Sequence, residues 1–340
     1  MRKFLSTHPY ILTFGAFQIF FSAPGQTFLI SLFVVPIFQE LGVSQSAFAG
    51  IYSAATLSAA LFLSPIGRLI DKYHVQSVIK IATVCMAIGC FILASTTNLI
   101  VLFIGFFILR LIGQGIFGLT SSTLMIKKFE KNRGKSMGII TLGFPISEAI
   151  YPSIALLLIS IIGWRLTYVL FGMSNVLLML PLQLYLLKKS NIKYGEFFPG
   201  EIDINPQHLR GNPEERKIRP HKNCTLAEVI KDRKFYFLLA ASCLPPMVVT
   251  GLFFHQGSLF ESNQWPISLA ATGIFTYALF KACGSVYMGV IVDRYGPLAP
   301  FVALIMLLGM GTFLASLGGS TVVIFIYFAL IGAALGFSSP

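Results

Sequence analysis

The feature that most constrains the fold of this chain is a series of long apolar stretches. They cover residues 10–37, 46–66, 77–96, 99–124, 135–162, 165–187, 234–260, 267–292, 298–317 and 321–340. A helix needs about 20 apolar residues to cross a lipid bilayer. Open strands are excluded there, because an unpaired backbone group is too costly in lipid. The sequence therefore predicts an all-α membrane protein whose chain crosses the bilayer once per stretch.

The composition agrees with lipid as the surrounding solvent. Charged residues make up 11% of the chain and the mean hydropathy is +0.78, whereas soluble domains carry about 25% charged residues. A chain of this kind exposes more apolar surface than water tolerates, so we expect it to be embedded in a bilayer.

The basic residues are concentrated in alternate loops. They gather at residues 2–3, 68–72, 127–135 and 188–234, and the loops between these hold almost none, with Arg165 as the exception. This distribution predicts that the N-terminus and the basic loops lie in the cytoplasm. The net charge of +12 does not indicate nucleic acid, because no basic and aromatic interleaving and no known binding module accompany it.

A polar segment divides the chain into two parts. Residues 188–233 contain prolines and mixed charges, and Thr225 and Glu228 have the spacing of a capping box. We expect a cytoplasmic linker with a short helix on the membrane surface. The domains are then a six-span bundle at residues 1–187 and a four-span bundle at residues 234–340.

A short motif occurs once in each part. It reads GRLIDKY at residues 67–73 and GVIVDRY at residues 289–295, and each copy joins two apolar stretches. Repetition of a charged loop at corresponding positions predicts two related halves, as in transporters built from repeats.

Together these features resemble the major facilitator superfamily. The repeated motif matches the loop after the family's second and eighth helices, and Arg110–Gly115 and Gly138–Pro145 resemble its fourth- and fifth-helix motifs. Residues 24–27 and 163–165 are similar to those of bacterial monocarboxylate and organic-anion carriers. The resemblance implies a monomeric secondary carrier of a bacterial inner membrane. It also implies that the two loop motifs lock the outward-open state through Gly67, Asp71, Lys72, Gly289, Asp293 and Arg294.

The chain departs from the family pattern in two places. His74, Val75 and Gln76 stand where the family has a glycine followed by basic residues. The family has twelve helices, so helices eleven and twelve are missing and we expect a C-terminal truncation. A fragment of a longer carrier and a transport-inactive remnant are both open, and so is an exporter of drugs or metabolites on the same fold.

Three ionisable residues fall near the middle of apolar stretches: Arg110, Glu148 and Lys281. Each costs at least about 2.5–3.5 kcal/mol at mid-bilayer, which makes each a functional hypothesis. Burial favours the protonated form of a carboxyl group and a nearby arginine favours the charged form. Glu148 is therefore a candidate proton carrier that pairs with Arg110 in one state; a permanent structural pair of the two is the alternative.

The cations are candidates for binding an anionic substrate. No acidic residue lies in the apolar stretch of Lys281, so a substrate anion or Glu148 from the other half are its possible partners. Arg110 is a second substrate-binding candidate, or it tunes the proton affinity of a nearby acid; a structural ion pair or hydrogen bonds to helix carbonyls are the alternative. His255 is a candidate proton relay because histidine titrates near neutral pH, and Gln26 and Gln256 are candidate polar lining.

Enzymatic activity has no support in the sequence. It contains no phosphate-binding loop, no GxSxG or HExxH motif, and no His/Cys cluster with metal-ligand spacing. We therefore predict no cofactor and no metal. The expected partners are a small anionic substrate, protons and the lipid bilayer.

Overall fold

The computed structural model describes residues 6–70, 73–129, 133–190, 229, 231–266, 269–295 and 298–337. Within these ranges the chain is helical and contains no strand. Seven stretches of helix are long and apolar enough to cross a membrane. Many large apolar side chains face outward on them, including Leu61, Phe237 and Leu298. The predicted all-α membrane fold is confirmed.

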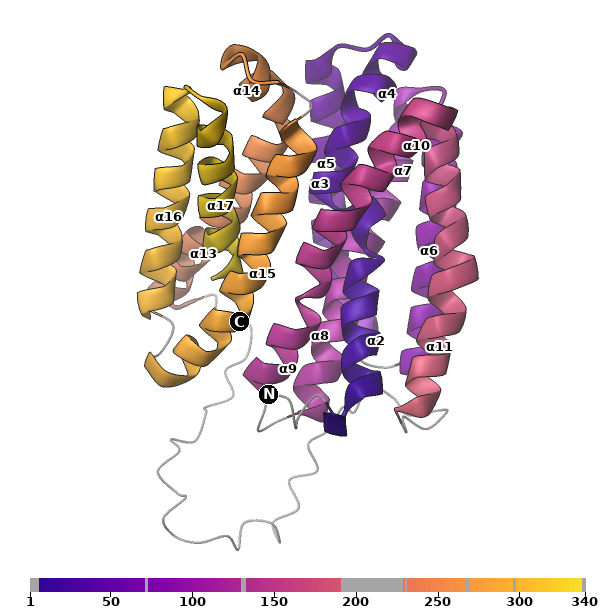
Figure 1. The fold of residues 1–340 in the computed structure, drawn as a ribbon. Helices are drawn as coiled ribbons and strands as arrows, with labels where there is room; N and C mark the ends of the chain where they lie inside the picture. Colours follow the sequence, from indigo (N-terminus) through magenta and orange to yellow (C-terminus); the bar gives the residue numbers. More distant parts are fainter. Residues whose placement is uncertain are drawn as a thin grey trace, which may run out of the picture.

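The helices form two bundles that stand side by side (Figure 1). The first contains α2 (Pro9–Phe20), α3 (Thr27–Ile30), α4 (Val34–Leu41), α5 (Gln45–Ile70), α6 (Val75–Ala94), α7 (Leu99–Leu109), α8 (Phe117–Lys128), α9 (Arg133–Ile140), α10 (Gly143–Ser174) and α11 (Leu180–Lys189). The second contains α13 (Arg233–Phe254), α14 (Gln256–Ser262), α15 (Leu269–Tyr295), α16 (Leu298–Leu317) and α17 (Thr321–Gly336). The domain boundaries at residues 187 and 234 stay predictions, since most of the linker lies outside the described residues.

The first predicted span is interrupted at its centre. After α2 ends, residues Ala23–Gly25 form a 3-10 turn before α3 begins. Pro24 has no N–H to continue an α-helix, and the glycine beside it permits close contact with another backbone. The α-helix of this span is therefore interrupted at Ala23–Gly25.

Spans one and four touch backbone to backbone at that interruption. A Cβ atom on Gly25 would collide with the carbonyl oxygen of Leu109, and one on Gly113 would meet Gly25 itself. Residues Arg110–Ile116 adopt a π-helical turn between α7 and α8. Such turns are frequent at functional sites. This close approach fixes Arg110 beside the interrupted part of span one.

The chain reverses direction inside α10. Gly163 has φ 78° and ψ 165°, a conformation essentially restricted to glycine. The reversal separates the two predicted spans at residues 135–162 and 165–187, and α9 and α11 accordingly lie at the same end of the bundle (Figure 1).

The seventh span behaves differently from the first. Pro245 and Pro246 lie inside a continuous helix, α13, and the interruption falls later, at His255 between α13 and α14. Prolines are tolerated within membrane helices because neighbouring groups satisfy the freed backbone atoms. The corresponding positions of the two halves are therefore not broken in the same way.

Candidate functional site

The two bundles are connected by an ion pair between α10 and α15. Lys281 Nζ lies 2.5 Å from Glu148 Oε1, and the residues are 9% and 5% exposed. The ammonium group also lies 5.4 Å from the ring centres of Phe144 and Tyr277. A carboxylate and two aromatic faces thus surround the Lys281 charge.

The pair is only partly saturated with hydrogen bonds. Glu148 Oε2 is buried without a hydrogen-bond partner, although the carboxylate interacts electrostatically with Tyr277. Breaking a buried pair by removing one partner costs about 3–5 kcal/mol, because the other charge is left uncompensated.

Arg110 is the second buried cation, and it is held by neutral groups. Its Nη1 donates to the Gly25 carbonyl oxygen at 3.1 Å and to Thr27 Oγ1 at 3.0 Å. Its guanidinium carbon lies 5.3 Å from the ring centre of Tyr52. The interruption of span one is what exposes the Gly25 carbonyl to this side chain.

No carboxylate of the described residues lies within ion-pair distance of Arg110. The residue is 4% exposed and its Nε has no hydrogen-bond partner. Among the described residues the buried charges are Arg110, Glu148 and Lys281, so their sum is one positive charge. The sequence left a Glu148–Arg110 pair open, whereas in this structure Glu148 pairs with Lys281.

The predicted polar lining divides between the halves. Gln26 is buried and its Nε2 donates to Ser22 Oγ at 3.1 Å and to the Gly113 carbonyl at 3.3 Å, which places it at the contact of spans one and four. Gln256 is buried at the start of α14, while His255 is exposed beside Phe254. The structure brings Gln26 together with Arg110, and Glu148 with Lys281.

The loop motifs are described only in part. Gly67 lies in the last turn of α5, against Leu119. Asp71 and Lys72 lie outside the described residues. Gly289, Asp293 and Arg294 belong to α15, and their side chains lie outside the described part as well. The role of these motifs stays a prediction.

Sequence reasoning missed two aromatic residues of the site. Tyr277 precedes Lys281 by four residues, which places both on one face of a helix, so this signal was present in the sequence. Tyr52 carried no such signal, because its contacts with Arg110 and Thr27 join distant parts of the chain.

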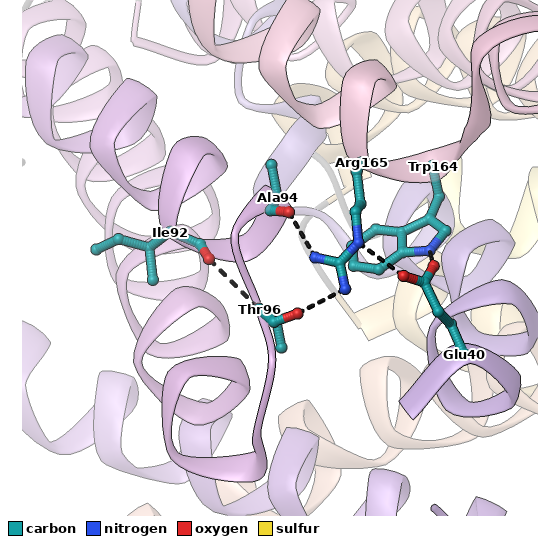
Figure 2. Close-up of polar contacts among 6 residues, drawn as sticks. All are labelled: Glu40, Ile92, Ala94, Thr96, Trp164 and Arg165. Carbon is teal, nitrogen blue, oxygen red and sulfur yellow. Dashed lines mark hydrogen bonds and ion pairs between the residues drawn. The ribbon is translucent and has the colours of Figure 1, made fainter. Parts of the chain in front are cut away.

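A second polar cluster joins the ends of α4, α6 and the second half of α10 (Figure 2). Arg165 Nε contacts Glu40 Oε1 at 2.8 Å, and its two terminal nitrogens donate to the carbonyl oxygens of Ala94 and Thr96, each at 2.7 Å. Trp164 Nε1 donates to Glu40 Oε2 at 2.5 Å. This cluster, the Arg165 clamp, ties the end of span one to the ends of spans three and six.

No group of three or more His, Cys, Asp or Glu residues in the described part of the chain could hold a metal ion. The site consists of a buried ion pair between the two bundles and a buried arginine within the first bundle.

Comparison with known proteins places the chain in a family. The model of the Major Facilitator Superfamily matches residues 15–340, and the chain belongs to that superfamily. No curated protein shows a significant match.

Solved transporter structures share the fold. A bacterial homologue of the human lysosomal transporter Spinster, inward-facing and unoccupied, matches with a TM-score of 0.68 at 16% identity, over 97% of this chain and 73% of its own. A mutant of the nucleoside transporter NupG matches with a TM-score of 0.64 at 15% identity, over 98% of this chain and 80% of its own. At this identity the likeness concerns the fold alone, and the family and these neighbours are transporters rather than enzymes.

Proposed function

We propose that this transporter is a secondary carrier of a small organic anion that moves its substrate together with protons by alternating access. The proposal places it as a monomer in a bacterial inner membrane, with its N-terminus and basic loops in the cytoplasm. Substrate binds between the bundles, and rocking of the bundles exposes the site to one side at a time.

The observation that carries this proposal is the uncompensated charge of Arg110. A buried cation without a carboxylate partner is costly unless a ligand supplies the opposite charge. A carboxylate is the natural ligand of a guanidinium group, because the two match in hydrogen-bonding geometry. Arg110 is therefore assigned to the substrate anion, with Gln26 as polar lining near it.

The Glu148–Lys281 pair supplies the coupling. Protonation of Glu148 removes its negative charge and frees Lys281, which then attracts the anion. Release of the anion restores the pair and expels the proton. Because the pair joins α10 to α15, its state depends on the relative position of the bundles, and proton uptake is linked to their movement.

The remaining candidates have supporting roles. His255 and Gln256 lie at the interruption of the seventh span and serve proton access and substrate lining. The loop motifs, through Asp71 and Asp293, lock the conformation that is closed to the cytoplasm.

Uptake into membrane vesicles tests the proposal. Radiolabelled acetate, pyruvate and lactate are supplied with and without an imposed pH gradient, and Arg110→Gln serves as the comparison. We expect gradient-dependent accumulation of at least one anion, which Arg110→Gln abolishes. Uptake that ignores the gradient for every anion would refute proton coupling, and wild-type uptake by Arg110→Gln would refute the substrate assignment.

A further inference from the structure

Four aromatic side chains meet where the two bundles touch on the side opposite the basic loops. Phe48, Tyr52 and Phe106 belong to the first bundle, and Phe254 belongs to the second. The Tyr52 and Phe254 rings are stacked with centres 5.6 Å apart, and the Phe48 and Phe254 rings are 6.4 Å apart. Phe106 supports Phe48 and Tyr52 from behind, each at 5.5 Å and edge to face.

These rings lie near the ends of α5 and α13. Phe48 lies in the first turn of α5, directly after the loop that follows span one, and Phe254 is the last residue of α13. Both ends face away from the basic loops. Helices α3 and α13 also contact each other. Separation of the bundles on this side must therefore part Phe254 from Tyr52.

Tyr52 also belongs to the surroundings of Arg110. Its hydroxyl group is hydrogen-bonded to Thr27 Oγ1 at 3.0 Å, and the same Thr27 oxygen accepts from Arg110 at 3.0 Å. The guanidinium lies over the Tyr52 ring. The Tyr52 side chain thus contacts Arg110 in its own bundle and Phe254 in the other bundle.

We propose that Tyr52 and Phe254 form an aromatic gate on this side, and that the Tyr52 hydroxyl couples the gate to anion binding at Arg110. An anion at Arg110 competes for the donors that now reach Thr27, so the Thr27–Tyr52 hydrogen bond rearranges and the ring shifts against Phe254. Tyr52 is a positioning residue in this scheme. The inference rests on the proposed carrier function.

A reversible cross-link tests the gate. Phe48→Cys and Phe254→Cys are combined after the native cysteines have been changed to alanine, and a short bis-methanethiosulfonate joins them. The control pair is Phe260→Cys with Phe328→Cys, whose rings are also 6.4 Å apart but lie within the second bundle. We expect the first cross-link to block uptake of the monocarboxylates until a reductant is added, and the second to leave it intact. Undiminished uptake with the first cross-link formed would overturn the gate.

Two variants of Tyr52 separate the ring from the hydroxyl group. Tyr52→Phe keeps the stacking and loses one hydrogen bond, so KM for uptake should rise about two- to tenfold with the maximal rate unchanged. Tyr52→Ala loses both the hydrogen bond and the ring stacking, so it should also open the gate. A KM unchanged in Tyr52→Phe would overturn the coupling.

A labelling experiment tests the gate independently of transport. It applies even if the wild type transports none of the anions. A Gln26→Cys reporter is exposed to a membrane-impermeant maleimide in right-side-out and inside-out vesicles. Tyr52→Ala and Phe254→Ala should each raise labelling severalfold from the side of the gate, whereas Phe260→Ala should not. Equal labelling in all of these variants would overturn the gate, and failed transport with increased labelling would refute only the carrier function.

Discussion

Arg110 and Lys281 are both buried cations inside membrane-spanning helices, yet their charges are compensated in different ways. Lys281 faces a carboxylate from the other bundle at 2.5 Å. Arg110 faces a carbonyl, a hydroxyl group and an aromatic ring, all from its own bundle. The environment of Lys281 therefore depends on how the bundles are placed, whereas the polar partners of Arg110 remain with it when the bundles move.

Under the proposed function, this difference separates two tasks of a coupled carrier. A charge held by neutral groups stays available for an anion in every conformation. A charge held by a titratable partner across the interface is available only when that partner is protonated or distant. The following substitutions test this difference between Arg110 and Lys281, in order of decreasing expected effect.

Glu148→Gln should have the largest effect, because it leaves Lys281 buried without a counter-charge. We expect the free energy of unfolding to fall by about 3–5 kcal/mol, measured as a lower thermal transition in detergent. The control is the double variant Glu148→Gln/Lys281→Met, which removes both charges and should recover most of the loss. A single variant as stable as the wild type would show that the pair contributes nothing.

Arg110→Lys should come next, because lysine keeps the charge but cannot present the planar fork of donors. Loss of hydrogen bonds to a charged group costs about 1.5–3 kcal/mol, so KM for anion uptake should rise about 10- to 100-fold. The measurement is the concentration dependence of uptake. A KM equal to that of the wild type would mean that any buried cation suffices at this position.

Arg165 is a third cation for comparison, because both carbonyl oxygens and a carboxylate bind it. The variant Arg165→Ala removes all of these contacts. The Arg165 side chain is 32% exposed and that of Glu40 47%, so solvent screening weakens the ion pair. Loss of the two carbonyl contacts should still cost about 1–2 kcal/mol of stability. KM for uptake should not change, and an altered KM would mean that the Arg165 clamp takes part in substrate binding.

Thr27→Val should have the smallest effect, because it removes one neutral hydrogen-bond acceptor of Arg110 while preserving the shape of the side chain. We expect a loss of about 1 kcal/mol in stability and a change in KM smaller than that of Arg110→Lys. Circular dichroism during heating and the uptake assay provide the two measurements. An effect as large as that of Arg110→Lys would place the Thr27 hydroxyl, rather than the guanidinium, at the centre of the site.

The sequence predicted an all-α membrane fold correctly because the length of an apolar stretch is a local property. The reversal at Gly163 and the buried position of Arg110, Glu148 and Lys281 were visible in the same way. The partner of Glu148 was not, since Arg110 and Lys281 were both open and only the packing of α10 against α15 decides between them. Likewise, the helix α13 continues through Pro245 and Pro246, although proline removes a backbone donor.

The interruption of span one also has a mechanical consequence. The segment from α3 to α4 is held at one end by the contact of Gly25 with Gly113 and at the other end by the Arg165 clamp. A rod fixed at both ends loses its independent rotational degrees of freedom. The position of the segment is therefore tied to that of α10 and α6 at one end and of Arg110–Ile116 at the other.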